Sequence, residues 1–239
     1  MGPEIIHHPL VRADGSATYS SSLFSVTAAV NGPIEVQRRD ELPEEAAIEV
    51  NIRPSSGVGG PRERWLESVV SGVLRSVLLV HMNPRTLIQI TLQVTKEPSL
   101  KLRRSVKDIA ALPSLLHASF LAVADGGLPL ATTMSASLVA VAETGETVLE
   151  PSEKELAKSR SAHAFSFNTH GDLLLDESAG EFDSQMWESV CQLAAKACAD
   201  TVQRGEDEAM GNGAAEKLPW LRLELEDRAR EGSAWRETT

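Results

Sequence analysis

Two arginines at the start of an amphipathic segment are the first candidates for chemistry. Arg62 and Arg64 follow a Gly-Val-Gly-Gly loop at 57–60. The first turn of a helix offers free backbone N–H donors and partial positive charge, and it therefore attracts anions. Guanidinium groups beside it add paired donors for a phosphate. The pattern fits a phosphate-binding site, and it also fits a flexible loop followed by two solvated arginines.

A second basic stretch spans residues 96–107. It holds five positive charges against one negative, and its cations include Lys101, Arg103 and Arg104. Such a run is usually a solvated, exposed loop, which is the first interpretation. The second interpretation is contact with RNA phosphates, which basic side chains bind without reading the bases.

Three carboxylates cluster after an expected strand, at Glu150, Glu153 and Glu155. Paired carboxylates can share acid–base work. However, Ser152 and Glu155 have the spacing of a capping box, and Glu153 suits the positive first turn of a helix. Local structure therefore explains the cluster, and acid–base chemistry by Glu150 and Glu155 is the alternative.

The motifs of several common enzyme classes are missing from the sequence. It has no Gly-x-x-x-x-Gly-Lys run, no Gly-x-Gly-x-x-Gly after a strand and no Gly-x-Ser-x-Gly elbow. His7 and His8 would point to opposite faces of a strand, so they are a poor metal pair. His117 lies in an apolar segment, where a hydrogen-bonded core histidine is expected rather than a ligand or general base. No metal and no cofactor is predicted.

The composition is that of a globular protein. With 239 residues, 42% hydrophobic and 24% charged, the chain can form one large domain or two small ones. Aromatic residues make up 4%, which argues against a single-strand binder built on stacked rings. A net charge of −11 repels a phosphate backbone in general, so any RNA contact must come from a local basic patch.

The sequence predicts an acidic, soluble, intracellular protein. Residues 1–10 have neither a basic start nor an apolar run. No stretch approaches the roughly 18 apolar residues of a membrane span. Cys191 and Cys198 would lie about 10 Å apart on one helix, which is too far for a disulfide.

Hydrophobic periodicity predicts a single body over residues 1–204, of α/β class with mixed sheets and packed helices. An acidic and mostly flexible tail is expected over 205–239, with one or two helical turns near Trp220 to Arg228. The basic stretch at about 96–107 interrupts the body as an insertion.

Two helices stand out within the body. An apolar stripe predicts one from Pro61 to about Asn83, and an apolar segment predicts a buried one from Ser114 to Asp125. The Asn-Gly-Pro run at 31–33 is expected to end the strand before it. The other expected elements are strands near 16–30, 48–52, 88–94, 134–142, 162–167 and 173–176, a short helix after Ser152 and a long helix over 182–201.

The order of several short motifs resembles the RNase PH family, in particular ring subunits of the eukaryotic RNA exosome. The likeness covers about 10–204 and implies an RNase PH-like domain, of the type called ribosomal protein S5 domain 2-like. The segments that carry it are Arg12-Ala-Asp-Gly-Ser16, the strand to Val26-Thr-Ala-Ala-Val-Asn-Gly-Pro33, Ile48-Glu-Val-Asn-Ile-Arg53, Arg62-Glu-Arg64, the run from His117 to Pro129, and Val148-Leu-Glu-Pro151.

Active members of this family cleave RNA from its 3′ end with inorganic phosphate. They hold that phosphate with a Gly-Ser/Thr-Arg element just before the buried helix, where this chain reads Ala-Leu-Pro-Ser at 111–114. The arginine is missing, and Pro113 has no amide N–H to donate. At the place of the catalytic aspartate stands Ala162, which can neither bind Mg²⁺ nor move a proton. The resemblance by itself would imply an enzyme, but the residues at these two places argue for a non-catalytic subunit. The alternative is a divergent phosphate-dependent exoribonuclease that uses Glu150 and Glu155 with Mg²⁺.

The resemblance also implies partners and a location. Six RNase PH-like subunits would form a ring around a channel, with three S1/KH cap proteins above it and a separate hydrolytic 3′–5′ exoribonuclease below. Arg62 and Arg64 match the place where ring subunits present arginines to RNA. Such a complex would process rRNA and degrade RNA in the nucleus, nucleolus and cytoplasm, away from membranes. A third hypothesis is an unrelated α/β interaction module with no role in RNA metabolism.

Overall fold

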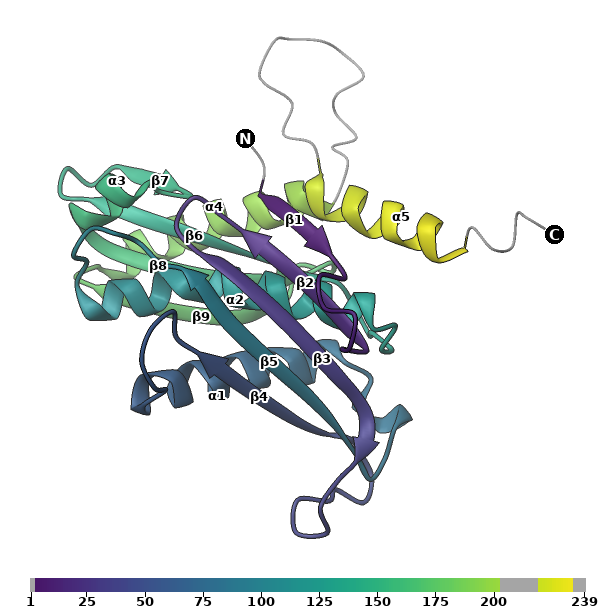
Figure 1. The fold of residues 1–239 in the computed structure, drawn as a ribbon. Coiled ribbons are helices and arrows are strands. Elements are labelled where there is room, and N and C mark those ends of the chain that lie inside the picture. The colour runs from purple at the N-terminus through teal and green to yellow at the C-terminus, as the bar shows by residue number, and fades with distance from the viewer. Residues whose placement is uncertain (1–2, 203–218, 234–239) are drawn as a thin grey trace, which may run out of the picture.

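The computed structural model describes residues 3–202 and 219–233 of the chain, in which two β-sheets and five helices are arranged in layers (Figure 1). Five strands form the larger sheet, in the order β1-β2-β3-β5-β4. They are β1 (Glu4–His7), β2 (Gly15–Ser20), β3 (Ser25–Glu35), β5 (Thr86–Lys96) and β4 (Ala47–Arg53). Neighbours are antiparallel except β4 and β5, because helix α1 (Pro61–Val77) carries the chain across between them.

The alternation in β3 and β5 buries one face of this sheet. Val26, Ala28 and Val30 on β3 are fully buried, as are Ile90 and Leu92 on β5. Helices α1 and α2 (Arg104–Asp125) pack behind that face (Figure 1). The mixed α/β class and the strands predicted near 48–52 and 88–94 are confirmed in this sheet. The single strand predicted near 16–30 is two strands, β2 and β3, and β1 was not predicted.

Strand β3 does not end at the Asn-Gly-Pro run, and that prediction is wrong. The strand continues to Glu35, with a bulge between Asn31 and Ile34. Gly32 makes this path possible, because a Cβ at this position would lie 2.7 Å from the carbonyl oxygen of Leu87. Pairing with β5 on both sides of the bulge outweighs the local turn signal.

Helix α1 begins at Pro61 as predicted but ends at Val77, well before Asn83. Leu78 leaves the helix because its backbone forms a β-bridge with Leu130. The next N–H, of Leu79, donates to the carbonyl of Pro129 at 3.0 Å. A contact with a segment distant in sequence therefore sets the end of the helix.

Helix α2 begins at Arg104 and not at Ser114, so the prediction missed its first turns. Pro113 lies inside the helix, although proline removes a helical hydrogen bond. Val106 and Ile109 in the early turns are buried, and this packing holds the helix together across the proline. By length and composition alone α2 could cross a membrane, but 83% of its most apolar window is buried inside the molecule.

The smaller sheet has the order β7-β6-β8-β9. Its strands are β6 (Met134–Ala142), β7 (Thr147–Leu149), β8 (Ser159–Asn168) and β9 (Leu173–Gly180). Helix α4 (Ser184–Val202) covers one face, where Phe165, Val190 and Cys198 share a core. The short helix α3 (Glu153–Ala157) begins with the capping box predicted for Ser152 and Glu155.

The C-terminal helix α5 (Trp220–Ser233) is longer than the one or two turns predicted. It packs on the body through Leu221, which is fully buried, and Trp220, whose ring lies 5.7 Å from that of Tyr19. Figure 1 shows α5 beside β1 and the end of α4. Residues 205–218 and 234–239 of the expected flexible tail lie outside the described residues, and the division at 204 stays a prediction.

Candidate nucleic-acid interface

A cavity of about 340 Å³ lies where the start of α1 meets the start of α2. We call it the α1–α2 cavity. The loop after β4 closes one side with Ser55, Ser56 and Val58. Three cations and three carboxylates line the cavity, so their charges cancel. These residues are Arg62, Glu63, Glu97, Arg104, Lys107 and Asp108.

Arg62 lines this cavity but is not free. Its Nε donates to Asp108 in a short hydrogen bond, and its Nη1 lies 3.4 Å from a carboxylate oxygen of Glu63. Only 16% of the Arg62 side chain is exposed. Glu63 is itself held by the N–H of Gly60, at 2.7 Å. An RNA phosphate that binds Arg62 must therefore compete with Asp108.

Arg64 differs from Arg62 in both respects. Its side chain is exposed, and it has no hydrogen bond or ion pair with any residue that the structure describes. Residues two apart on a helix point in different directions, so Arg64 does not line the α1–α2 cavity. Trp65, the next residue in the sequence, is 37% exposed.

The basic stretch at 96–107 is only partly an exposed loop, so that prediction needs correction. Lys96 ends β5, and the residues from Arg104 onward belong to α2. Lys107 is paired with Glu97 at 2.6 Å. Lys101 is exposed and has no side-chain partner among the described residues.

Arg103 and Arg104 have opposite surroundings. Nη2 of Arg103 donates to the backbone carbonyls of Ser159 and Arg160, at 2.5 and 3.0 Å, and so ties the segment before α2 to β8. Arg104 is exposed, lines the α1–α2 cavity and has no side-chain partner in the described part of the chain. The five predicted RNA-binding residues thus fall into three groups. Arg103 is hydrogen-bonded to the backbone of β8, and Arg62 is paired with acids. The side chains of the other three are exposed and have no partner among the described residues.

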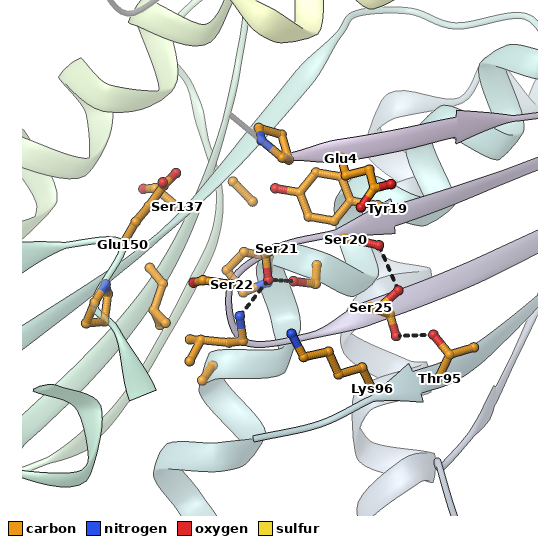
Figure 2. A pocket seen from close by; sticks show the side chains of 18 residues that line it. Glu4, Tyr19, Ser20, Ser21, Ser22, Ser25, Thr95, Lys96, Ser137 and Glu150 are labelled. Atoms are coloured by element: carbon orange, nitrogen blue, oxygen red, sulfur yellow. Dashed lines mark hydrogen bonds between the residues drawn. The ribbon is translucent and has the colours of Figure 1, made fainter. Parts of the chain in front are cut away.

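A second and larger cavity, of about 880 Å³, opens between the two sheets. We call it the serine cavity, since hydroxyl groups dominate its wall: Tyr19, Ser20, Ser21, Ser22, Ser25, Thr95, Ser114 and Ser137. Its charged lining residues among those the structure describes are Lys96, Glu4 and Glu150, none of which is an arginine. Figure 2 shows Glu150 and Ser137 on one side, with Lys96 and Thr95 opposite. The wall carries one positive and two negative charges.

The segment at 111–114 reaches this cavity through Pro113 and Ser114. These residues lie in the interior of α2 and not at its N-terminus, where free N–H groups would be found. The Ser114 hydroxyl is hydrogen-bonded to that of Ser21, at 3.2 Å. Backbone donors for an anion are therefore absent from this stretch of the wall.

Glu150 and Glu155, the alternative acid–base pair, have separate roles. Glu150 lines the serine cavity and has a left-handed backbone, with φ of 50°, which is costly for a residue with a side chain. Burial raises the pKa of Tyr19 above its usual range, and the charge of Glu150 adds to this rise. Glu155 does not line the cavity. It caps α3, and hydrogen bonds from the hydroxyl and N–H of Ser152 lower the pKa of Glu155.

Ala162 and His163 occupy opposite faces of β8. Ala162 is fully buried against the core and does not line either cavity. His163 is also fully buried, and hydroxyls of Ser161 and Ser178 lie 2.9 and 2.8 Å from its two ring nitrogens. Burial lowers the pKa of His163. Sequence analysis missed this polar chain, because Ser178 lies on the neighbouring strand.

His117 is the predicted core histidine, and its position confirms this. Its Nε2 accepts the N–H of Ala136 at 3.1 Å, and burial lowers the pKa of His117 to about 3. The imidazole is therefore neutral. Its Nδ1 has no hydrogen-bond partner among the described residues, and its ring instead contacts those of Tyr19 and Trp220. Over residues 3–202 and 219–233, no three His, Cys, Asp or Glu side chains converge as a metal site would require.

Comparison with known proteins gives a consistent result. Residues 4–129 match the 3′ exoribonuclease family, domain 1, known as RNase PH. The chain is 32% identical over 201 residues to the exosome complex component RRP46 of Saccharomyces cerevisiae, covering 81% of this chain and 88% of that protein. It is 30% identical to the exosome complex exonuclease RRP46 homolog of Arabidopsis thaliana, over 64% of this chain and 59% of that protein.

Solved structures support the same fold. The crystal structure of rice (Oryza sativa) Rrp46 superposes with a TM-score of 0.70 at 29% identity, over 82% of this chain and 89% of that one. A chain of the Archaeoglobus fulgidus exosome with RNA bound to the active site superposes with a TM-score of 0.66, over 82% of this chain and 85% of that one. At 14% identity, the second likeness concerns the fold alone.

Proposed function

Because this chain belongs to the RNase PH family of 3′ exoribonucleases, we propose that it is a non-catalytic ring subunit of the RNA exosome that helps to line the channel through which RNA passes. Its similarity to yeast RRP46 over most of both chains supports a place in the ring.

The wall of the serine cavity carries the argument against catalysis. Phosphorolysis needs an inorganic phosphate held and oriented for attack. The cavity offers that anion one lysine, two carboxylates and a helix interior in place of free N–H groups. Glu4 and Glu150 repel a phosphate there, and Ala162 supplies no carboxylate. A bound phosphate would therefore be neither oriented nor helped to react.

The RNA contact rests on the cations at the starts of α1 and α2. Arg64, Lys101 and Arg104 are exposed and without side-chain partners among the described residues, and Arg62 shares the α1–α2 cavity with Arg104. Contacts of this kind hold phosphates whatever the base, and they weaken with salt. RNA threaded along this surface would pass on to a separate hydrolytic 3′–5′ exoribonuclease.

The proposal includes partners and locations that the resemblance implies. Other RNase PH-like subunits would flank this chain in the ring, and S1/KH cap proteins would cover it. The complex would act in the nucleus, including the nucleolus, and in the cytoplasm, on rRNA precursors and RNA undergoing decay.

Arg64→Glu in the assembled complex tests the RNA contact. We expect RNA crosslinking to this subunit to fall, and the salt dependence of RNA binding to lose a slope of about 0.7 per lost phosphate contact. Arg12→Glu, which reverses another exposed charge, is the matched control. Equal crosslinking in the wild type and in Arg64→Glu combined with Arg62→Glu would contradict the RNA contact.

A divergent phosphorolytic enzyme is the second candidate, because Glu150 lines the serine cavity and has a strained backbone. The purified chain, alone and in the complex, is to be incubated with RNA, Mg²⁺ and phosphate. Release of nucleoside diphosphates that depends on phosphate and is lost in Glu150→Gln would establish this enzyme. No release is expected from a non-catalytic subunit.

A further inference from the structure

The loop between β4 and α1 places two exposed serines on the wall of the α1–α2 cavity. Ser55 and Ser56 line it together with Arg62, Arg104 and Lys107. We infer that the Ser55–Ser56 pair is a phosphorylation site, and that a phosphate there binds the cavity cations and blocks their contact with RNA. This inference rests on the proposed RNA contact and adds a means of regulating it.

Both serines are accessible to a protein kinase. They are exposed, and the loop that follows contains three glycines, of which Gly57 has a φ of 85° that favours glycine. Such a loop has no helix or sheet hydrogen bonds to break when a kinase binds it. Arg53, exposed just before the pair, adds a positive charge that basic-directed kinases recognise.

The reaction is an ordinary phosphoryl transfer from ATP. The bond between the γ-phosphorus and the oxygen that bridges to the β-phosphate breaks, and a bond from the serine Oγ to that phosphorus forms. ADP leaves with the bridging oxygen, and the hydroxyl proton is released. The product carries close to two negative charges and three acceptor oxygens at neutral pH.

The cavity has a cation ready for this phosphate. Arg104 has no side-chain partner in the described part of the chain, whereas Lys107 is already held by Glu97 and Arg62 by Asp108. The phosphate can bind Arg104 directly. It can also compete with Asp108 for Arg62, because a dianion attracts a guanidinium more strongly than one carboxylate does. The cavity charges cancel without phosphate, so the added dianion leaves this surface negative and repels RNA.

Three measurements test the inference. Phosphopeptide mass spectrometry of the chain from its own cells is expected to find phosphate on Ser55 or Ser56. The full chain is also prepared with phosphoserine encoded at 55, at 56 and, as a control, at Ser184, which is exposed at the start of α4. Phosphorus NMR of the phosphoserine at 55 or 56 is expected to show it titrating at higher pH after Arg104→Gln.

The third measurement is RNA crosslinking of the assembled complex. Phosphoserine at 55 or 56 is expected to reduce it about tenfold at moderate salt, and phosphoserine at 184 to leave it near the unmodified value. If Arg104→Gln left the phosphoserine titration unchanged at both 55 and 56, the inference would be overturned, and the proposed RNA contact would still stand. The inference would also be overturned if phosphoserine at 55 and 56 left RNA crosslinking undiminished while Arg64→Glu abolished RNA crosslinking. If neither the phosphoserines nor Arg64→Glu reduced RNA crosslinking, the proposed RNA contact would be overturned, and this inference with it.

Discussion

Arg228 on α5 and Asp125 at the end of α2 form an ion pair across 103 residues of sequence, with Nη2 and Nε of the guanidinium 2.6 and 2.7 Å from one carboxylate oxygen. The Asp125 side chain is fully buried. Its other oxygen accepts the N–H of Ser16 at 2.9 Å and lies 2.8 Å from Nδ1 of His8. This carboxylate therefore joins the N-terminal strands, the central helix and the C-terminal helix.

Arg228→Met is expected to lower the free energy of unfolding by about 2 kcal/mol, because it leaves a buried carboxylate with fewer charged partners. Urea unfolding of the full chain measures this loss. Arg230→Met is the matched control, since Arg230 lies on the same helix and its ion-pair partners among the described residues are exposed acids. Its expected effect is below about 0.5 kcal/mol. Equal effects of the two changes would contradict the joining role of Asp125.

The Asp125 carboxyl also predicts a pH dependence of stability. Burial alone would raise the pKa of Asp125, but the Ser16 N–H, His8 and Arg228 together lower it below the ordinary value. A lowered folded-state pKa stabilises the fold at pH values above the unfolded pKa of about 4, and this stabilisation is lost as the pH falls through the folded value.

Asp125→Asn should accordingly flatten the acid limb of the stability profile below about pH 4. Urea midpoints of the wild type and the variant at several acidic pH values measure it. Glu188→Gln, an exposed acid on α4, is the control and should keep the wild-type slope. An Asp125→Asn profile parallel to the wild type would contradict the assignment.

Releasing Arg62 from Asp108 is expected to strengthen RNA binding. Asp108→Asn removes the negative charge that holds the Arg62 guanidinium, so RNA crosslinking of the assembled complex should increase about threefold, of the order of one weak ion pair. Glu188→Gln makes the same change in net charge at an exposed residue that does not line the α1–α2 cavity, and it should have no such effect. Reduced or unchanged crosslinking in Asp108→Asn would exclude Arg62 as an RNA contact.

Lys101 is expected to contribute to RNA binding, and Arg103 to the stability of the fold. Arg103→Met removes the donor to two backbone carbonyls and should cost about 1–2 kcal/mol of stability. Lys101→Met removes an exposed cation and should leave the unfolding midpoint unchanged while it weakens RNA binding. Urea unfolding and RNA binding, measured on both variants, test the pair. If Lys101→Met lowered stability and Arg103→Met weakened only RNA binding, both assignments would be wrong.

Local pattern was enough to predict most elements but not their limits. Alternation identified the strands around Val26 and Ile90, and the apolar stripe identified α1. At Gly32 and Pro113 tertiary packing overrides a local turn or proline signal, and α1 ends early at Leu78 because that residue pairs with the distant Leu130. Such contacts are set by the tertiary fold, and no window of sequence contains them.

The candidate site was predicted as residue types and not as an arrangement. The sequence identified the arginines that begin α1 and α2, but gave no means to see that Arg62 meets Asp108 across 46 positions. It could not distinguish Arg103, bound to carbonyls of β8, from the free Arg104 beside it. Each distinction depends on which strands and helices become neighbours in space.

The proteins that copurify with this chain decide whether it is a ring subunit. A tagged copy at its natural level is to be purified, and the copurifying proteins measured by quantitative mass spectrometry. For a ring subunit we expect other RNase PH-like subunits and S1/KH cap proteins at equal stoichiometry, together with a hydrolytic 3′–5′ exoribonuclease. A chain recovered alone, or as a ring of identical copies, would contradict it.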